Sequence, residues 1–130
     1  MSEDADPARY RALLGLVPDT VPQRRRVAAR AGESDAVDAV EALRERLIAG
    51  NPLPPSTAQL VHFALLVGGG HSLPAELHAR AALRAGASAR DLFGVCELAA
   101  VTGGMPAFTL AVACVEAALA APDLNPPPGS

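Results

Sequence analysis

Glycine and proline residues divide this chain of 130 residues into short segments, each long enough for one helix. Within the segments, apolar residues recur at three- and four-residue steps and do not alternate as they would in a strand. The spacing predicts helices at about 7–16, 22–32, 34–48, 56–67, 72–85, 88–103 and 105–121. We therefore predict an all-α bundle of about six to seven helices in a single domain, residues 1–121, followed by a disordered proline-rich tail at 122–130.

The uncharged run at residues 98–115 approaches the length of a membrane span. Residues 103–106, Gly-Gly-Met-Pro, interrupt it, and we interpret the two halves as core helices because proline and glycine end helices. We expect no membrane partner. The acidic N-terminal residues lack the apolar segment of a signal peptide, so a cytoplasmic location is expected.

The segments from residue 56 onward are apolar nearly all round. Helices of this kind need neighbours on several sides, which a domain of this size does not supply. We therefore expect subunit interfaces in a symmetric homo-oligomer.

Charge and composition exclude several classes of function. The net charge is −3, which gives no electrostatic basis for binding nucleic acid. The one basic cluster, Arg24, Arg25, Arg26 and Arg30, is interpreted as the solvated face of a helix. Every basic residue is arginine, and the absence of lysine excludes a Schiff-base, pyridoxal-phosphate or P-loop lysine. We expect no cofactor.

Two residues could carry proton-transfer chemistry. His78 shares a predicted helix face with small alanines, which lets another helix or a ligand approach its imidazole. Glu97 stands on a nearly uncharged helix, so we expect its carboxylate to be at least partly buried and in need of a partner. That partner is either an arginine, Arg80 or Arg84, in a structural ion pair, or His78 in a catalytic pair.

The other candidates are weaker. His62 lies on the apolar fourth segment, on a face shared with Gln59, and a hydrogen-bonded core histidine is its simplest interpretation. His71 stands in a glycine-rich turn. No two histidines have the helical spacing of four residues that presents two metal ligands together, so we expect no metal. Cys96 and Cys114 are expected to be buried, reduced thiols.

Residues 77–108, LHARAALRAGASARDLFGVCELAAVTGGMPAF, resemble the core motif of the carboxymuconolactone decarboxylase family, part of the alkylhydroperoxidase D-like superfamily. The matching features are the histidine His78, Ala-Leu-x-x-Gly at 82–86, a capped helix, and Gly-x-Pro-Ala at 104–107. PLPPSTAQLVHFALLV at 52–67 resembles the helix that precedes this core.

The resemblance implies an all-α fold that assembles as trimers or hexamers, and a proton-handling role for His78 in loss of carbon dioxide from a lactone acid without cofactor. The peroxidase branch has a Cys-x-x-Cys where this chain has His71 and Pro74, so the dithiol is absent. The family often carries glutamate at the position of Gly94 and an aromatic residue at that of Thr102, and this chain departs from both.

These observations predict a cofactor-independent enzyme that decarboxylates, isomerises or cyclises a small organic acid, lactone or enolisable carbonyl compound. His78 and Glu97 are the predicted catalytic residues, and His62, His71 and Thr102 the predicted substrate contacts. The alternative is a non-catalytic oligomeric binding or scaffold domain, and a less favoured one is a thiol peroxidase.

Overall fold

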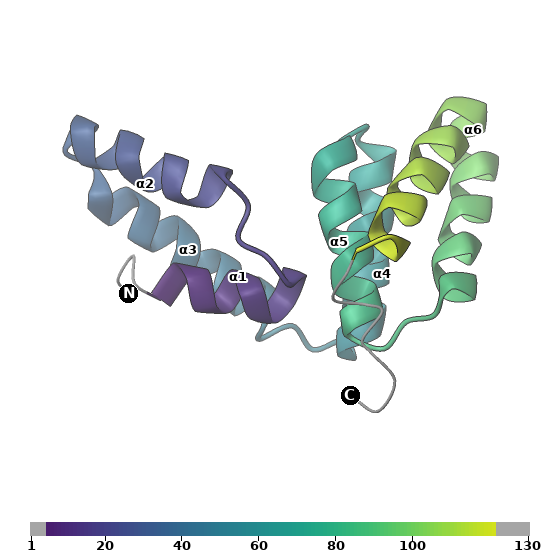
Figure 1. Ribbon diagram of the computed structural model, residues 1–130, viewed down its shortest axis with the longest axis horizontal. Helices are drawn as coiled ribbons and strands as arrows, with labels where there is room; N and C mark the ends of the chain where they lie inside the picture. Colours follow the sequence, from purple (N-terminus) through teal and green to yellow (C-terminus); the bar gives the residue numbers. More distant parts are fainter. Residues whose placement is uncertain (1–4, 122–130) are drawn as a thin grey trace. The chain divides into compact units, whose positions relative to one another are not determined.

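The computed structural model describes residues 5–121, which form six helices joined by short turns (Figure 1). The chain divides between Pro52 and Leu53 into two compact units. The predicted proline-rich tail at 122–130 lies outside the described residues. The helical prediction is confirmed, since the described residues contain no strand.

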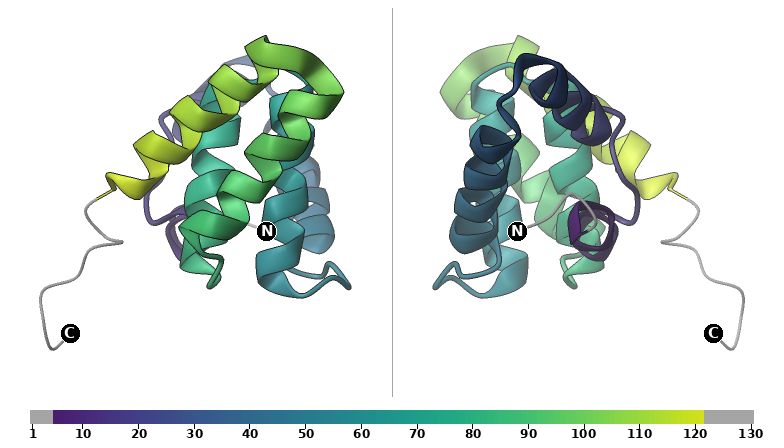
Figure 2. Two further views of the ribbon diagram at one scale, coloured as in Figure 1. Left: turned by 90° about the vertical axis from the view of Figure 1, so that its right-hand side faces the viewer. Right: turned by 90° about the vertical axis from the view of Figure 1, so that its left-hand side faces the viewer.

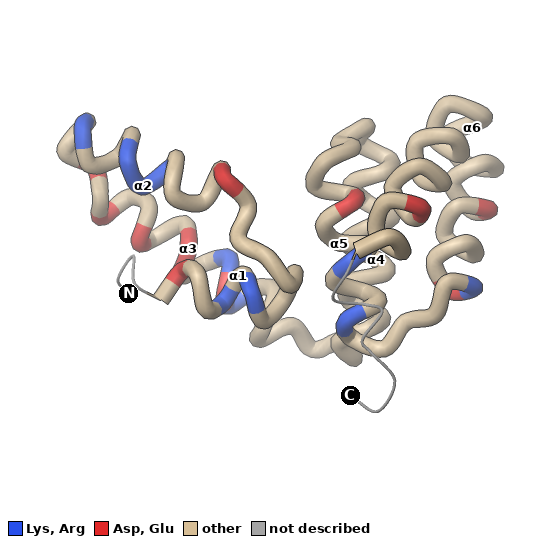
Figure 3. Tube along the Cα trace, in the orientation of Figure 1, with Lys and Arg blue, Asp and Glu red and all other residues tan. Residues whose placement is uncertain are grey.

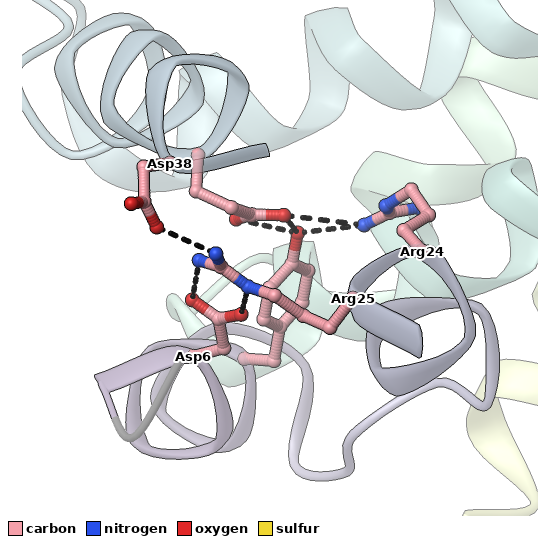
Figure 4. A network of polar contacts seen from close by, with 6 residues as sticks. Asp6, Arg24, Arg25 and Asp38 are labelled. Carbon is pink, nitrogen blue, oxygen red and sulfur yellow. Dashed lines mark hydrogen bonds and ion pairs between the residues drawn. The ribbon is translucent and has the colours of Figure 1, made fainter. Parts of the chain in front are cut away.

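The N-terminal unit consists of α1 (Asp6–Leu14), α2 (Thr20–Ala31) and α3 (Ser34–Ile48). Polar contacts between helices hold much of it together (Figure 4). Arg25 Nε donates to Asp6 Oδ2 at 2.7 Å, and Arg25 Nη1 donates to Asp38 Oδ1 at 2.5 Å. These hydrogen bonds join α1, α2 and α3 and raise the pKa of the Arg25 guanidinium.

A second set of polar contacts surrounds Tyr10 of α1. Its hydroxyl donates to the buried carboxylate of Glu41 at 2.9 Å, and Arg24 binds the same carboxylate oxygen at 3.3 Å. The guanidinium of Arg44 lies over the Tyr10 ring at 4.4 Å. The expectation that the arginine cluster forms a solvated face is therefore wrong for Arg25, which is buried because two carboxylates compensate its charge.

The C-terminal unit consists of α4 (Pro55–Gly68), α5 (Ser72–Arg84) and α6 (Ala89–Leu119). Each of these helices packs against the other two. Small side chains permit the close approach, because α5 contributes mainly alanines to the core. The core consists of Phe63, Val67, Ala75, Ala79, Ala82, Ala87, Leu92, Cys96, Ala111, Cys114, Val115 and Ala118.

Helix α6 begins at a capping box formed by Ser88 and Asp91. The Ser88 side chain accepts a hydrogen bond from the Asp91 amide at 3.0 Å, and the Asp91 carboxylate accepts one from the Ser88 amide at 2.9 Å. These bonds lower the pKa of Asp91. In contrast, Ser34 and Ser72, which are also typical N-cap residues, lie inside the first turn of their helices.

A break at Gly104 divides α6 into two arms. Its φ of 78° and ψ of −172° are values that only glycine adopts without strain, and Pro106 follows without an amide hydrogen to continue the helix. The chain turns back there, so that the arms form an inverted V (Figure 2).

By length and composition alone, α6 is apolar enough to cross a membrane. The bend argues against such a span, because the first arm, residues 89–103, is only about 22 Å long at 1.5 Å per residue. Its buried residues, including Leu92 and Cys96, pack in the core of the unit. The bend therefore supports the interpretation of the run as two helices. Within residues 98–115, Ala111, Cys114 and Val115 are buried, but none of residues 98–106 is, so the expectation of a core helix is wrong for that first stretch in the single chain.

Apolar side chains of α4 and α6 remain exposed in the single chain. Leu65 is 70% exposed, Leu98 69% and Val101 87%. Water-exposed apolar surface of this kind is typical of an interface with another molecule. It is consistent with the expected homo-oligomer, which stays a prediction.

We predict that the purified protein is larger than its chain mass of 13.3 kDa, because association would cover these exposed leucines and valines. Light scattering coupled to gel filtration measures the mass directly. Leu98→Glu should shift the protein toward the monomer. Ala36→Glu, at an exposed position of α3, should not. A mass near 13.3 kDa that persists at high protein concentration would contradict the prediction.

We also predict that Gly104→Ala lowers the free energy of unfolding by about 1–3 kcal/mol, because alanine is strained at a φ of 78°. Gly94→Ala is the matched control, since Gly94 lies in the same helix and an added Cβ there would meet no atom within 4 Å. That substitution should be neutral or stabilise by up to about 1 kcal/mol. Urea unfolding, monitored by circular dichroism, measures the free energy of unfolding of both variants. Equal changes in the two variants would show that a side chain at residue 104 causes no strain.

Candidate functional site

A buried polar pair joins α5 to α4. His78 Nδ1 lies 2.8 Å from Gln59 Oε1, and both side chains are buried, with His78 only 6% exposed. A carbonyl oxygen accepts and cannot donate, so this arrangement places the proton on Nδ1 and the lone pair of the imidazole on Nε2.

A second histidine lies against the first. The His62 and His78 rings are stacked, with centroids 3.7 Å apart and planes inclined by 30°. His62 is half-buried, so it is the more accessible member of the pair. The three side chains, Gln59, His62 and His78, form what we call the histidine cluster.

The sequence explains why these residues meet. Gln59 and His62 are three positions apart on α4, so they project from one face of that helix. On α5, Ala75 and Ala82 lie one turn before and one turn after His78, and both are fully buried. Their small side chains let α4 approach closely enough for the rings to stack.

Glu97 does not have the environment that its sequence suggested. Its side chain is exposed, so the expectation of partial burial is wrong. It follows Cys96, which faces the core, and successive residues of a helix point about 100° apart. The apolar neighbours Phe93 and Val101 are themselves exposed, so an uncharged helix face did not mean a buried one. Glu97 as an acidic partner of His78 stays a prediction, now one that requires a neighbouring subunit.

The remaining predicted contacts lie outside the histidine cluster. His71 is exposed and is the N-cap residue of α5. Thr102 is exposed at the end of the first arm of α6, where it lines a groove of about 690 Å³ between α4 and α6. That groove is otherwise apolar, with walls that include Val61, Leu65 and Leu98.

A second groove, of about 830 Å³, lies between the start of α5 and the second arm of α6. Its polar lining includes Ser72, Glu76 and Thr109, and its apolar lining includes Met105. Pro106 and Leu110 line both grooves, so the second arm of α6 separates them.

Both thiols are buried on α6, as predicted. Burial raises the pKa of Cys96 and of Cys114, and neither forms a disulfide. The Cys114 thiol donates to the carbonyl oxygen of Ser72 at 3.4 Å. Because the thiolate is the reactive form, both side chains are poor nucleophiles near neutral pH.

Among residues 5–121, no group of three or more histidine, cysteine, aspartate or glutamate side chains is arranged to hold a metal ion. Gln59 is the site residue that sequence reasoning missed. Its position three residues before His62 was the available signal, but an amide on an apolar helix has many structural explanations.

The sequence of residues 34–117 matches the model of the carboxymuconolactone decarboxylase family. The chain belongs to the carboxymuconolactone decarboxylase family. The match covers the whole histidine cluster and both grooves, and it leaves out α1 and α2. No protein of curated function matches the sequence.

The fold agrees with this assignment. A crystal structure from Burkholderia xenovorans LB400, of a protein classed as a carboxymuconolactone decarboxylase, superposes with a TM-score of 0.72 over 87% of each chain. The two sequences are 24% identical, so the likeness concerns the fold alone. The match includes most of this chain, whereas the family model begins only at residue 34.

We predict that the two thiols react slowly with iodoacetamide in the native protein at pH 7, because both are buried and protonated. The rate should still rise with pH beyond 9.0, the ordinary thiol pKa above which the rate of an unperturbed thiol levels off. The stability gained by keeping the thiols neutral is fully present below that pH and is lost as the pH rises through the raised pKa of the folded state.

Mass spectrometry of quenched samples measures the extent of labelling at each cysteine. A cysteine introduced by Ser34→Cys, at an exposed position of α3, supplies an internal standard for a reactive thiol. Cys96 or Cys114 reacting as fast as that standard at pH 7 would contradict the analysis.

Proposed function

We propose that this family member is a cofactor-independent enzyme that uses His78 to transfer a proton to or from a small organic acid, lactone or enolisable carbonyl compound. Family membership and the hydrogen bond between His78 Nδ1 and Gln59 Oε1 support the proposal. That hydrogen bond is the single observation on which the assignment of roles depends.

Gln59 is the positioning residue. By accepting a hydrogen bond from Nδ1–H, Gln59 Oε1 selects one tautomer and fixes the orientation of the ring, so that Nε2 carries the basic lone pair. A neutral amide does this without adding a charge, in contrast to a carboxylate, which would also stabilise the imidazolium. A base that is not held as imidazolium remains able to accept a proton near neutral pH.

His62 limits the charge that the cluster can hold. At 3.7 Å, two imidazolium rings would repel each other by about 4 kcal/mol at an effective dielectric constant of about 20. The pair therefore favours carrying one positive charge at most, and a proton taken up by His78 is readily passed on to the substrate. This behaviour suits isomerisation, in which one proton is removed from carbon and another is added, and decarboxylation, in which carbon gains a proton as carbon dioxide leaves.

The half-buried edge of His62 is the side from which we expect a substrate to approach, since His78 itself is nearly enclosed. His71 and Thr102 lie outside the cluster, and as substrate contacts they stay predictions. In this proposal Glu97 acts from a neighbouring subunit.

A second candidate function is a non-catalytic oligomeric binding or scaffold domain. One observation favours it, namely that His78 is only 6% exposed and stacked on another ring. A structural histidine would look the same in a single chain. Thiol peroxidase activity has less support, because His71 and Pro74 stand at the dithiol positions and both cysteines are buried.

We predict that His78→Gln lowers turnover by about 10²–10⁴-fold, the usual contribution of a positioned proton-transfer group. Assays would follow loss of carbon dioxide from carboxymuconolactone, and incorporation of solvent deuterium into a panel of small enolisable acids by NMR. His71→Gln is the matched control, because it makes the same chemical change at an exposed position. Equal activity of the two variants would contradict the proposal. A His78→Gln protein that loses both its activity and its folded structure would favour the scaffold.

Gln59→Leu tests the positioning role without a known substrate. It should convert the His78 ring from one Nδ1-protonated tautomer to a mixture, which nitrogen-15 spectra of the imidazoles distinguish. Gln59→Glu should instead raise the pKa of His78, because a carboxylate favours imidazolium. An unchanged tautomer in Gln59→Leu would show that the amide does not position the ring.

A further inference from the structure

We infer that the N-terminal unit carries a binding site for a small amphipathic anion, one with a carboxylate head and an apolar body. The site is a groove of about 610 Å³ formed by α1, α2 and the turn between them. These residues precede the family match, which begins at residue 34, and none of them belongs to the histidine cluster.

The groove has a charged side and an apolar side. Its lining consists of Pro7, Arg11, Val17, Val21, Pro22, Arg25, Arg26 and Ala29. Among these residues three are arginines and none is acidic. Five are apolar, so the walls can take a hydrocarbon body while a guanidinium group at the edge holds an anionic head.

The structure separates the roles of the clustered arginines. Arg24 binds Glu41, and Arg25 is committed to Asp6 and Asp38, so neither offers its charge to a ligand. Arg26 is exposed, takes no part in these contacts, and lines the groove. The network behind the groove holds α1 against α2, which places Arg11 of α1 and Arg26 of α2 on the same groove.

Arginine suits this role better than other basic residues, because its planar guanidinium donates two parallel hydrogen bonds to a carboxylate. The arginines of the chain are concentrated in this unit (Figure 3). Eight of the eleven basic residues lie within residues 1–52, namely Arg9, Arg11, Arg24, Arg25, Arg26, Arg30, Arg44 and Arg46. Nine acidic residues, Glu3, Asp4, Asp6, Asp19, Glu33, Asp35, Asp38, Glu41 and Glu45, balance them, so an anion is held by local placement and not by net charge.

The test uses the full-length protein with octanoate as probe, and isothermal titration calorimetry to measure the affinity. Octanoate should bind saturably with one site per chain. Arg26→Gln should weaken binding by roughly tenfold, because a hydrogen bond to a charged group is lost. Arg30→Gln is the matched control: it removes the same charge one turn further along α2, outside the groove, and should leave the affinity unchanged.

Three further measurements decide between alternatives. Octanol, with the same apolar body and no charge, should bind at least tenfold more weakly, and so should acetate, which lacks the body. The His78→Gln protein should bind octanoate as the unchanged protein does, which separates this site from the proposed catalytic one. Absence of saturable octanoate binding, equal affinity in Arg26→Gln and Arg30→Gln, or binding lost in His78→Gln would each overturn the inference.

Discussion

The bend at Gly104 is the constraint on which the C-terminal unit depends. It allows an uncharged run of membrane-span length to fold into two shorter arms, which bring Cys96 and Cys114 into one core. Only a residue without Cβ adopts this backbone conformation freely, so a single glycine decides whether the run packs on itself. Both grooves of the unit depend on the bend too, because Pro106, two residues beyond it, lines each of them.

Most of the helical layout could be predicted from the sequence, because helix boundaries are set locally. Gly32 and Gly86 adopt positive φ where glycine was expected to end a helix, and the Ser88–Asp91 capping box begins the helix that was predicted to start at residue 88. Local signals could not report which helix faces would be buried, since burial depends on what packs alongside. Glu97 illustrates the difference: its helix is nearly free of charge, yet its side chain is exposed within the C-terminal unit.

The histidine cluster was only partly predictable for a related reason. Each histidine could be identified as a titratable group on an apolar helix, and helical spacing placed Gln59 on the face of His62. The contact to His78 joins residues nineteen positions apart in the sequence and depends on the alanines that let α4 and α5 approach. A periodicity argument describes one helix at a time, so it cannot show that an amide of α4 meets an imidazole of α5.

The two units reach stability by different physical means, and this bears on where new binding chemistry can arise. The C-terminal unit buries alanine, leucine and two thiols, and it keeps very few buried polar groups, among them Gln59 and His78. The N-terminal unit instead buries Asp6, Arg25 and Glu41, which are stable only because each has a partner of opposite charge or a hydrogen-bond donor. In the apolar C-terminal unit an added charge would lack such partners. The N-terminal unit already contains networks of arginine and carboxylate, so it can hold the further guanidinium of Arg26 at the edge of a groove. A site for an anion is therefore better supported in the N-terminal helices, where charge is already compensated, than in the apolar grooves of the family domain.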